Sequence, residues 1–566
     1  MNTNNIVGDM VYDLQPAQND SNVSSADMAT IANLQTDILQ ELLDDLNSRG
    51  GGTLQLGYGV YYLSRPLVTY SNITIAGRGE LTVLDGSSLP VGDINQRPFL
   101  IRSSGSYQGE VRFSTDLVEG QTNLSVTGNL TALRVGMLLL IRSNERQENW
   151  SELPFKEELQ RIVGINQNDA TIEVDSGLLF NYTNQSNLSA SIYEPTTNIA
   201  IKDLRINMGG VGSVHSGILF DYGYNINLDN VIVDGAESIG VQITRSYLFT
   251  IHNCHLQNST SPLIPNFFTG YGLAIISSSC YGRIEGNIFD NCRHGITGGN
   301  SAPHHINIER NIFTNCRTGY ALGCHEPCMY WVMSGNTIQG CVSGINGRGM
   351  YLTISDNVIK NVTGVGISVG GTEGIPLPFA KQYVISNNRI TNTGGRAIEL
   401  RGQFGPIEGA MIQENTCIKT LGILVRESRN VLIHNNIVDQ SEVYDDVRYC
   451  IHLVTCNNIT ILGNHLLGIG THGIFSTDSI DVNISNSIFT PGSAVGQILN
   501  GVIRSARGEK LMITNNQFQT LNRLTIFTST LNHIIFVNNI ITSNVPNNVN
   551  FQDATNIINR DNMYVS

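Results

Sequence analysis

One short pattern recurs along the sequence from residue 283 onward: an apolar residue, two others, Asn, one more residue and a second apolar residue. Ser487 takes the Asn place in one copy, and the spacing between copies varies from 21 to 31 residues. Leucine-rich and tetratricopeptide arrays have units of nearly fixed length, so this variation predicts a coil whose turns differ in length. The Asn positions are Asn287, Asn311, Asn336, Asn357, Asn388, Asn415, Asn436, Asn464, Asn516 and Asn539.

Each repeat alternates apolar and polar residues with a period of two, which is the pattern of a strand. A second short strand, entered through Gly, follows in most repeats, as in VGISV at 365–369 and LGILV at 421–425. Two or three strands per turn would pair with neighbours about 4.8 Å above and below. The sequence therefore predicts an all-β fold, a right-handed parallel β-helix.

The repeated Asn has a structural explanation, because stacked Asn side chains can pair with each other and with turn backbone. Asn also tolerates the left-handed conformation that tight turns need, and contact with a ligand is the alternative. Cys292, Cys316 and Cys341 each follow an Asn by five residues. We expect them to stack inward as small apolar residues, with a disulfide or redox role as the alternative.

Composition narrows the classes of function. The formal charge of −14 argues against nucleic acid as a partner, because affinity for phosphates comes largely from Lys and Arg. No secretion signal opens the chain and no run of 18 apolar residues occurs, so membrane insertion is not expected. The ten cysteines show no metal-ligand spacing, and neither a metal nor a cofactor is expected.

The N-terminal region predicts a helix followed by the first turns of the coil. Residues 26–47 carry apolar residues at helical spacing, with Ile31, Leu34, Ile38, Leu42 and Leu46 on one face. The sequence then reads GGGTLQLGYGVYYL, and ITIAG follows at 73–77. This opening resembles that of the pectate-lyase-like superfamily. The matching residues are Gly50 to Thr53, Gly57, Tyr61 and Asn72 to Gly79. The resemblance implies a helix that caps the first turn and covers unpaired strand edges.

The predicted organisation has four parts: a segment at 1–25, a cap with the first turns at 26–104, a strand-rich insertion at 105–198 and the main coil at 199–566. A similar insertion recurs in β-helical phage tailspikes, where it is either a surface decoration or a substrate-binding part. In tailspikes a segment like 1–25 docks to other tail proteins of the virion, and a flexible tail is the alternative.

An arginine column is the first candidate site. Aligning the second strands by Ile345, Ile367, Ile398, Ile423 and Ile451 brings Arg401 and Arg426 to outward positions on adjacent turns. Their column continues through Arg348, Gly370 and Val454. Two guanidiniums at that spacing need an anion near them. The functional interpretation is a subsite for an acidic sugar, with Glu399 or Glu427 as proton-transfer group. The alternative is a surface ladder of ion pairs.

A second candidate site is the stretch GCHEPCMYW at 323–331. His325 is a candidate base and Glu326 a candidate acid, while Tyr330 and Trp331 offer aromatic faces to a sugar ring. The alternative is that the polar residues are solvated and that Trp331 packs against the coil. No metal ligands are assigned.

The function expected from these features is that of a phage tailspike-type receptor-binding protein, which recognises and in some members degrades host surface polysaccharide. The resemblance implies a homotrimer on the virion tail, or otherwise an extracellular protein. The paired Asp of polygalacturonases and the clustered carboxylates of calcium pectate lyases are absent from the sequence. A free carbohydrate enzyme is the second hypothesis, as a polysaccharide lyase, glycoside hydrolase, epimerase or fructan transferase. A structural or adhesive β-helix without catalysis is the third.

Overall fold

The structure is a computed structural model that describes residues 11–14, 25–91, 98–127, 130–143, 156–183, 188–261, 269–371, 380–443, 448–491, 502–519, 526–542 and 549–565. The chain divides into two compact units. Unit 1 comprises residues 1–318 and 325–328, and unit 2 comprises residues 319–324 and 329–566. Most of the expected segment 1–25 lies outside the described residues.

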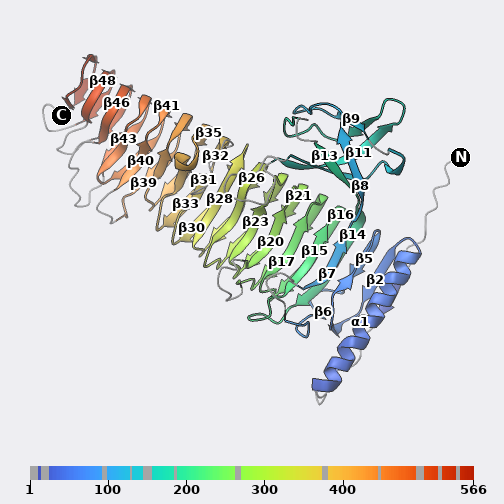
Figure 1. Ribbon diagram of the computed structural model, residues 1–566. Coiled ribbons are helices and arrows are strands. Elements are labelled where there is room, and N and C mark those ends of the chain that lie inside the picture. Colours follow the sequence, from blue (N-terminus) through green and yellow to red (C-terminus); the bar gives the residue numbers. More distant parts are fainter. Residues whose placement is uncertain are drawn as a thin grey trace. The chain divides into compact units, whose positions relative to one another are not determined.

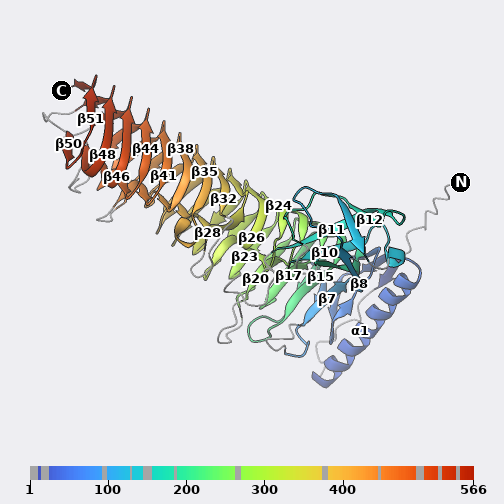
Figure 2. The ribbon, with the colours of Figure 1, turned by 45° about the horizontal axis from the view of Figure 1, so that its top comes forward.

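Unit 2 is a coil of parallel strands that form three ladders, in which each strand pairs with its equivalent one turn further on (Figure 1). Figure 2 shows the strands β32, β35, β38, β41 and β44 of ladder 2 side by side. Ladder 1 contains β28 (Ser343–Met350), β31 (Ile367–Gly370), β34 (Ile398–Arg401), β37 (Ile423–Arg426), β40 (Tyr449–Val454), β43 (His472–Thr477), the first parts of β46 (Ile503–Thr514) and β48 (Ile526–Val537), and β50 (Val549–Gln552).

Ladder 2 contains β29 (Thr353–Ser355), β32 (Lys381–Ser386), β35 (Ile407–Gln413), β38 (Ser428–His434), β41 (Asn457–Leu462), β44 (Ile480–Ser485), the second parts of β46 and β48, and β51 (Ile557–Arg560). Ladder 3 contains β27 (Thr337–Gln339), β30 (Val358–Val362), β33 (Arg389–Thr393), β36 (Thr416–Ile418), β39 (Ile437–Asp439), β42 (His465–Ile469), β45 (Ile488–Pro491), β47 (Gln517–Gln519), β49 (Ile540–Thr542) and β52 (Met563–Val565). The inward residues of the three ladders before β51 and β52 are mostly buried aliphatic and aromatic side chains, so the core runs along the inside of the coil.

The repeated Asn side chains form a buried ladder at the turn between ladders 2 and 3. Asn388 Nδ2 donates to Asn415 Oδ1 at 2.9 Å, and Asn415 Nδ2 donates to Asn436 Oδ1 at 3.0 Å. The same oxygens also accept the backbone N–H of the preceding Asn, as Asn415 Oδ1 does from Asn388 at 3.0 Å. The predicted side-chain pairing is confirmed, because each buried amide is satisfied by its neighbours.

The left-handed turn residue is not the ladder Asn itself but the residue before it. Asn387 has a φ of 54°, Glu414 of 56° and Asn435 of 52°, while Asn388 and Asn415 keep negative φ values. The conformational argument from the sequence was therefore wrong by one position. The ladder Asn is selected for its hydrogen bonds, and the residue before it for its tolerance of the left-handed region.

Unit 1 has the same three-ladder arrangement. Its first ladder contains β4 (Leu67–Val68), β7 (Phe99–Ser104), β15 (Ser216–Asp221), β17 (Ile239–Thr244), β20 (Tyr271–Ile276) and β23 (His294–Gly299). Its second contains β1 (Val11–Leu14), β2 (Gly52–Leu56), β5 (Ile73–Ala76), the first parts of β14 (Thr196–Asn207) and β16 (Gly223–Asp234), β18 (Tyr247–His252), β21 (Cys280–Glu285) and β24 (His304–Glu309). Its third contains β3 (Gly59–Tyr62), β6 (Thr82–Asp85), the second parts of β14 and β16, β19 (His255–Gln257), β22 (Ile288–Asp290) and β25 (Ile312–Thr314).

Helix α1 (Ser25–Ser48) covers the first strands of unit 1 (Figure 1). Gln35 Oε1 accepts the backbone N–H of Tyr62 at 2.6 Å, and Gln40 Oε1 accepts that of Val68 at 2.8 Å. Thr36 Oγ1 accepts the N–H of Ser64 at 3.0 Å. These side chains satisfy donors that would otherwise end the first turn unpaired, which is the physical role of a cap.

The buried face of α1 differs from the predicted one. Ala32, Leu39, Leu43 and Leu46 are buried, whereas Leu34 is 58% exposed and Ile38 is 36% exposed. Of the five predicted residues, only Leu46 is buried; Ile31 and Leu42 are half-buried. Both stripes follow helical spacing, and the polar Gln35 and Thr36 were excluded from the predicted face although the cap requires them on the buried side.

Six antiparallel strands of unit 1 close into a small barrel that interrupts the coil between β7 and β14 (Figure 1). They are β8 (Ser106–Phe113), β9 (Asn123–Thr127), β10 (Leu138–Arg142), β11 (Glu157–Asn166), β12 (Thr171–Val174) and β13 (Ser189–Glu194). Tyr193 of the barrel stacks on Tyr222 of the coil with ring centroids 3.5 Å apart. Buried Leu138, Leu140 and Leu159 continue this contact, so the barrel packs on the coil through an apolar surface.

The ten cysteines all lie in the described part of the chain, and each has a buried free thiol. Cys292 Sγ donates to the Leu256 carbonyl at 3.6 Å, and Cys341 Sγ to the Gln339 carbonyl at 3.5 Å. The expected inward packing of this column is confirmed. The long helix α1 is not apolar enough to cross a membrane, and no other described helix is both long and apolar enough to do so.

Candidate functional site

The arginine column predicted from the sequence lies on ladder 1 of unit 2. Arg401 pairs in register with Gly370 on one side and with Arg426 on the other, and Arg426 pairs with Val454. Gly347 pairs with Val369, which continues the column to Arg348, a half-buried residue. The register was predictable because the inward Ile of each strand fixes which residues point outward.

The two central arginines differ in what they bind. Arg401 Nε lies 3.1 Å from Glu399 Oε2, and the Glu399 side chain is only 15% exposed. Arg426 donates from an Nη atom to Gln403 Oε1 at 2.7 Å. Among the described residues, the buried Nε of Arg426 has no hydrogen-bond partner. Within the described part of the chain, the pair of guanidiniums therefore has one compensating carboxylate, that of Glu399.

The outward charge of ladder 1 is opposite in sign to that of the whole protein. The described strands of ladder 1 from β28 to the first part of β46 carry four arginines and one carboxylate. The arginines are Arg348, Arg401, Arg426 and Arg504, and the carboxylate is Glu399. In ladder 2 from β32 to β46, three basic residues balance three acidic ones, and the pairs include Arg429 with Glu408 at 3.2 Å and Lys510 with Asp481 at 3.0 Å. Ladder 1 is therefore a cationic face on a chain of charge −14.

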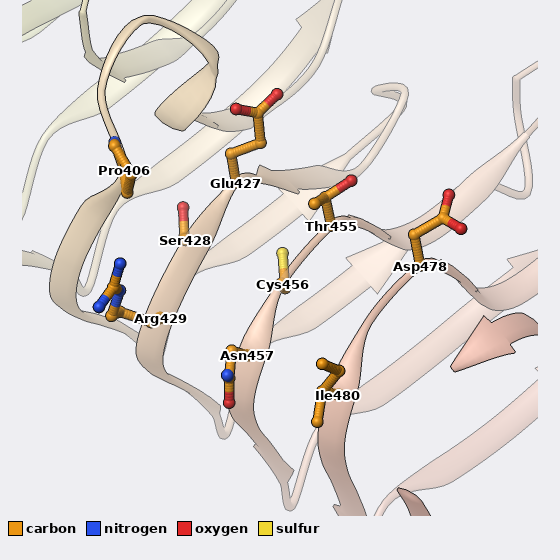
Figure 3. Close-up of a pocket in the computed structure, with 9 residues that line it drawn as sticks. All are labelled: Pro406, Glu427, Ser428, Arg429, Thr455, Cys456, Asn457, Asp478 and Ile480. Atoms are coloured by element: carbon orange, nitrogen blue, oxygen red, sulfur yellow. The ribbon is translucent and has the colours of Figure 1, made fainter. Parts of the chain in front are cut away.

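A shallow groove of ≈ 390 Å³ follows the corner between ladders 1 and 2 (Figure 3). Glu427, Thr455 and Asp478 form one row on successive turns, and Ser428 and Cys456 form the row beside it. The residues of the first row have φ values of 45°, 54° and 51°. This left-handed bend turns the chain from ladder 1 into ladder 2. The groove is further lined by Pro406, Arg429, Asn457 and Ile480.

The ionisable groups in this groove differ in their hydrogen-bond partners and therefore in what they could do chemically. Arg507 donates to both oxygens of Asp478, at 2.7 and 2.8 Å, and these bonds hold the pKa of Asp478 below its usual range. Burial raises the pKa of the Cys456 thiol, which donates to the Val425 and Val454 carbonyls at 3.4 Å each. Cys456 is thus a packed thiol and not a nucleophile. Among the described residues, Glu427 makes no ion pair, so its carboxylate is available to a ligand.

Ladder 1 also carries aromatic residues that the sequence reasoning missed. The column two residues before the arginines runs Glu399, Leu424, His452, Phe475 and Arg504, because each pairs in register with the next. The same Ile alignment contained this column one residue after each inward Ile. Only the column three residues after the Ile was followed, so His452 and Phe475 were not recognised.

The second predicted site is only partly supported by the placement of its residues. Trp331 is fully buried, which corrects the predicted stacking role of its indole and agrees with the alternative that it packs against the coil. Tyr330 is half-buried and stacks on Tyr351, with ring centroids 4.6 Å apart. His325 is a half-buried residue of β26 (Tyr320–Ser334), and the side chain of Glu326 lies outside the described residues.

An arginine-rich patch in unit 1 is neutral and does not form a comparable face. It contains Arg283 and Arg310 beside Glu285 and Glu309, with Arg283 2.6 Å from Glu285. Two cations and two carboxylates compensate each other, so a surface ion-pair network accounts for this patch. Among the described residues, no group of three or more His, Cys, Asp or Glu side chains is arranged to hold a metal ion.

One comparison, with models of known families, agrees with the fold. Residues 342–518 match the family described as the right-handed beta helix region. No curated protein matches the chain. Among solved structures, the tailspike of Pseudomonas phage phi297 shares 14% identity at a TM-score of 0.46, covering 76% of this chain and 73% of that one.

Two further solved structures have a similar level of likeness. The tailspike of Acinetobacter baumannii bacteriophage AP22, solved with a capsular saccharide, shares 11% identity at a TM-score of 0.43, over 97% of this chain and 78% of that one. PfbA, a surface adhesin of Streptococcus pneumoniae, shares 12% identity at a TM-score of 0.42, over 81% and 88%. These values are too low to bear on function. The family match and the parallel ladders together make this chain a right-handed parallel β-helix protein.

Proposed function

We propose that ladder 1 of unit 2 binds an acidic polysaccharide, in a receptor-binding role of the kind that phage tailspikes have. The observation that carries the proposal is the pair Arg401 and Arg426 on adjacent turns with a single carboxylate, Glu399, beside them. A guanidinium presents two parallel donors that match a carboxylate, and arginine is weakly hydrated. Two such groups one turn apart favour a ligand with repeated negative charge.

The geometry of the coil supports a linear ligand. Successive turns repeat about every 4.8 Å, so outward side chains of one column form a regular row. A polymer lying along the coil would meet an equivalent position on each turn. The tailspike role, with a homotrimer and contact to other tail proteins through residues 1–25, rests on the resemblance of the cap and of the insertion. Host surface polysaccharide on a virion tail is part of the same proposal.

A second candidate function is glycoside hydrolysis in the corner groove. Glu427 and Asp478 stand two turns apart, which is about 9.6 Å at the backbone. Inverting glycosidases separate their two carboxyl groups by roughly 6.5–9.5 Å. Asp478, held ionised by Arg507, would activate water, and Glu427 would protonate the leaving oxygen. The non-catalytic adhesin remains the third hypothesis.

Binding of the full chain to a panel of polysaccharides tests the first proposal. The panel contains bacterial capsular polysaccharides with acidic sugars, polygalacturonate and neutral dextran. We expect binding to at least one acidic polymer and none to dextran. The double variant Arg401→Ala, Arg426→Ala should weaken this binding by roughly a hundredfold, from two lost charge-assisted contacts.

The matched control is Lys510→Ala, which removes a cation from ladder 2 on the strand that also carries Arg504. It should bind as the wild type does. If no acidic polymer binds, or if the double variant binds as tightly as the wild type, the proposed function is wrong. Release of reducing ends that is lost in Glu427→Gln and Asp478→Asn would favour the hydrolase. Rising absorbance from an unsaturated uronate would instead indicate a lyase.

A further inference from the structure

Four aromatic rings form a cluster on the outward face of ladder 1, next to Arg426. They belong to Tyr449 and His452 on β40 and to His472 and Phe475 on β43. The Tyr449 ring centroid lies 4.8 Å from that of His452, 5.6 Å from that of His472 and 4.9 Å from that of Phe475. His452 and Phe475 stack at 5.1 Å with 24° between their planes.

The cluster lies outside the core of the coil. Ile451 and Ile474, which directly precede His452 and Phe475 on the same strands, point inward and are fully buried. Tyr449, His452 and Phe475 are half-buried, and only His472 is buried. Part of each of the first three rings is therefore accessible at the surface of the coil.

Cations stand at both ends of this cluster. The Arg396 guanidinium lies 6.0 Å from the centroid of the Tyr449 ring, and that of Arg504 lies 5.3 Å from the centroid of the Phe475 ring. Arg426 precedes His452 by one turn. From Arg426 to Arg504 the ladder advances three turns, or about 14 Å. This length accommodates a short run of sugar rings.

We propose that the cluster formed by Tyr449, His452, His472 and Phe475 is a stacking subsite for one sugar ring of an acidic polysaccharide. This inference rests on the proposed function and specifies its ligand. The carbon–hydrogen face of a pyranose is apolar and packs on aromatic faces, while its substituents remain polar. Arg426 and Arg504 then bind acidic groups on the sugars before and after the stacked ring. The preferred ligand is a chain in which acidic sugars alternate with neutral ones.

The cluster also has a purely structural interpretation. Cross-strand aromatic pairs stabilise sheets whether or not a ligand is present. A leucine at the position of Phe475 would keep the apolar contact area but remove the flat ring. The two interpretations therefore differ in what Phe475→Leu does to binding, and they agree that it leaves the fold intact.

The experiment measures the affinity of the full chain for whichever acidic capsular polysaccharides of the panel the wild type binds. Phe475→Leu and Tyr449→Leu should each weaken binding by roughly tenfold, and Phe475→Tyr should bind as the wild type does. Circular dichroism establishes that each variant is folded. Phe475→Trp gives an independent signal, because the emission of the new indole should shift when the polymer is added.

The outcomes separate the two proposals. If the wild type binds no acidic polymer, the proposed function is wrong, and the stacking subsite with it. If the wild type binds and Arg401→Ala, Arg426→Ala loses binding while folded Phe475→Leu keeps it, only the subsite is wrong. An unchanged emission of Phe475→Trp at saturating polymer would also contradict the subsite, even if a leucine variant failed to fold.

Discussion

Arg401 on β34 and Arg426 on β37 are register partners in ladder 1. Only one carboxylate of this ladder, between β28 and the first part of β46, lies beside them: that of Glu399, whose Oε2 is 3.1 Å from Arg401 Nε. Charge repulsion between the guanidiniums is thus only half compensated within the described part of the protein. A bound anion would compensate the remaining positive charge. The cations of ladder 2 differ in this respect, because carboxylates of the same ladder balance them.

Replacing Arg426 by lysine separates charge from geometry. Arg426→Lys keeps the positive charge but loses the planar fork, so binding to acidic polysaccharide should weaken by several-fold. The dependence of affinity on NaCl concentration should stay close to that of the wild type, whereas Arg426→Ala should reduce it. Titrations at several salt concentrations measure both quantities. Equal affinities of the lysine variant and the wild type would mean that Arg426 acts only as a point charge.

The strand register of ladder 1 was predictable from sequence because one inward Ile marks each turn. The arginine column followed from that alignment and lies where it was expected. His452 and Phe475 were missed because only one of the two outward columns was followed. Sequence does not give ring-to-ring distances, so the cluster with Tyr449 and His472 could be recognised only in three dimensions.

Trp331 shows a different limit of the sequence. Its neighbours His325 and Glu326 suggested a polar loop, but β26 runs through this stretch as a single strand of 15 residues. Alternation along a strand sends Trp331 inward and leaves Tyr330 half-buried on the other side. A polar composition with two cysteines does not reveal which residues face the core when the strand is irregular.

The buried Asn ladder predicts large and graded effects on stability. Asn415 donates to the Ile385 carbonyl at 2.9 Å and to Asn436 Oδ1, and its own oxygen accepts two bonds from Asn388. Asn415→Ala leaves several buried groups unsatisfied and should cost about 2–4 kcal/mol. Asn415→Ser should cost less, because a hydroxyl still accepts one backbone N–H. Urea-induced unfolding followed by circular dichroism measures the difference.

Ser487 provides the reverse substitution. Its Oγ accepts the N–H of Asn464 at 3.1 Å, but it makes no side-chain bond to Asn516. Ser487→Asn should restore the ladder and stabilise the fold by about 1 kcal/mol. Asn532→Ala, at an exposed position of β48, is the control and should change stability by less than about 0.5 kcal/mol. A destabilised Ser487→Asn would show that this turn lacks room for the longer side chain.

His452 should make stability depend on pH. Burial, and then the charges of Arg396, Arg426 and His472, lower the pKa of His452 to about 4. In the unfolded chain His452 takes up a proton at a higher pH than in the folded protein. The contribution of the neutral imidazole to the free energy of unfolding is therefore complete above about pH 6.5 and is lost as pH falls toward 4. His452→Gln should flatten that part of the pH profile of unfolding. Identical slopes for variant and wild type would contradict a neutral imidazole at His452.

Glu158 in the barrel should have the opposite pH dependence. Burial raises its pKa to about 7, although Gln160, Tyr182 and the Leu179 N–H donate to the carboxyl at 2.9 Å each. The folded protein then binds a proton that the unfolded chain releases above about pH 4.5. The stabilisation is complete below pH 4.5 and is lost as pH rises through 7. Glu158→Gln keeps a neutral group of the same shape, with Tyr182 rotated to accept from the new amide.

The variant should therefore match the wild type near pH 4.5 and be more stable at pH 8, by on the order of 2–3 kcal/mol. Hydrogen exchange of β11 and β12 in the full chain, followed at pH 5 and pH 8, reports this part of the molecule directly. Correction for the intrinsic pH dependence of exchange isolates the change in protection. If Glu158→Gln lowers protection at both pH values, the hydrogen bonds to the carboxylate outweigh the cost of burying its charge.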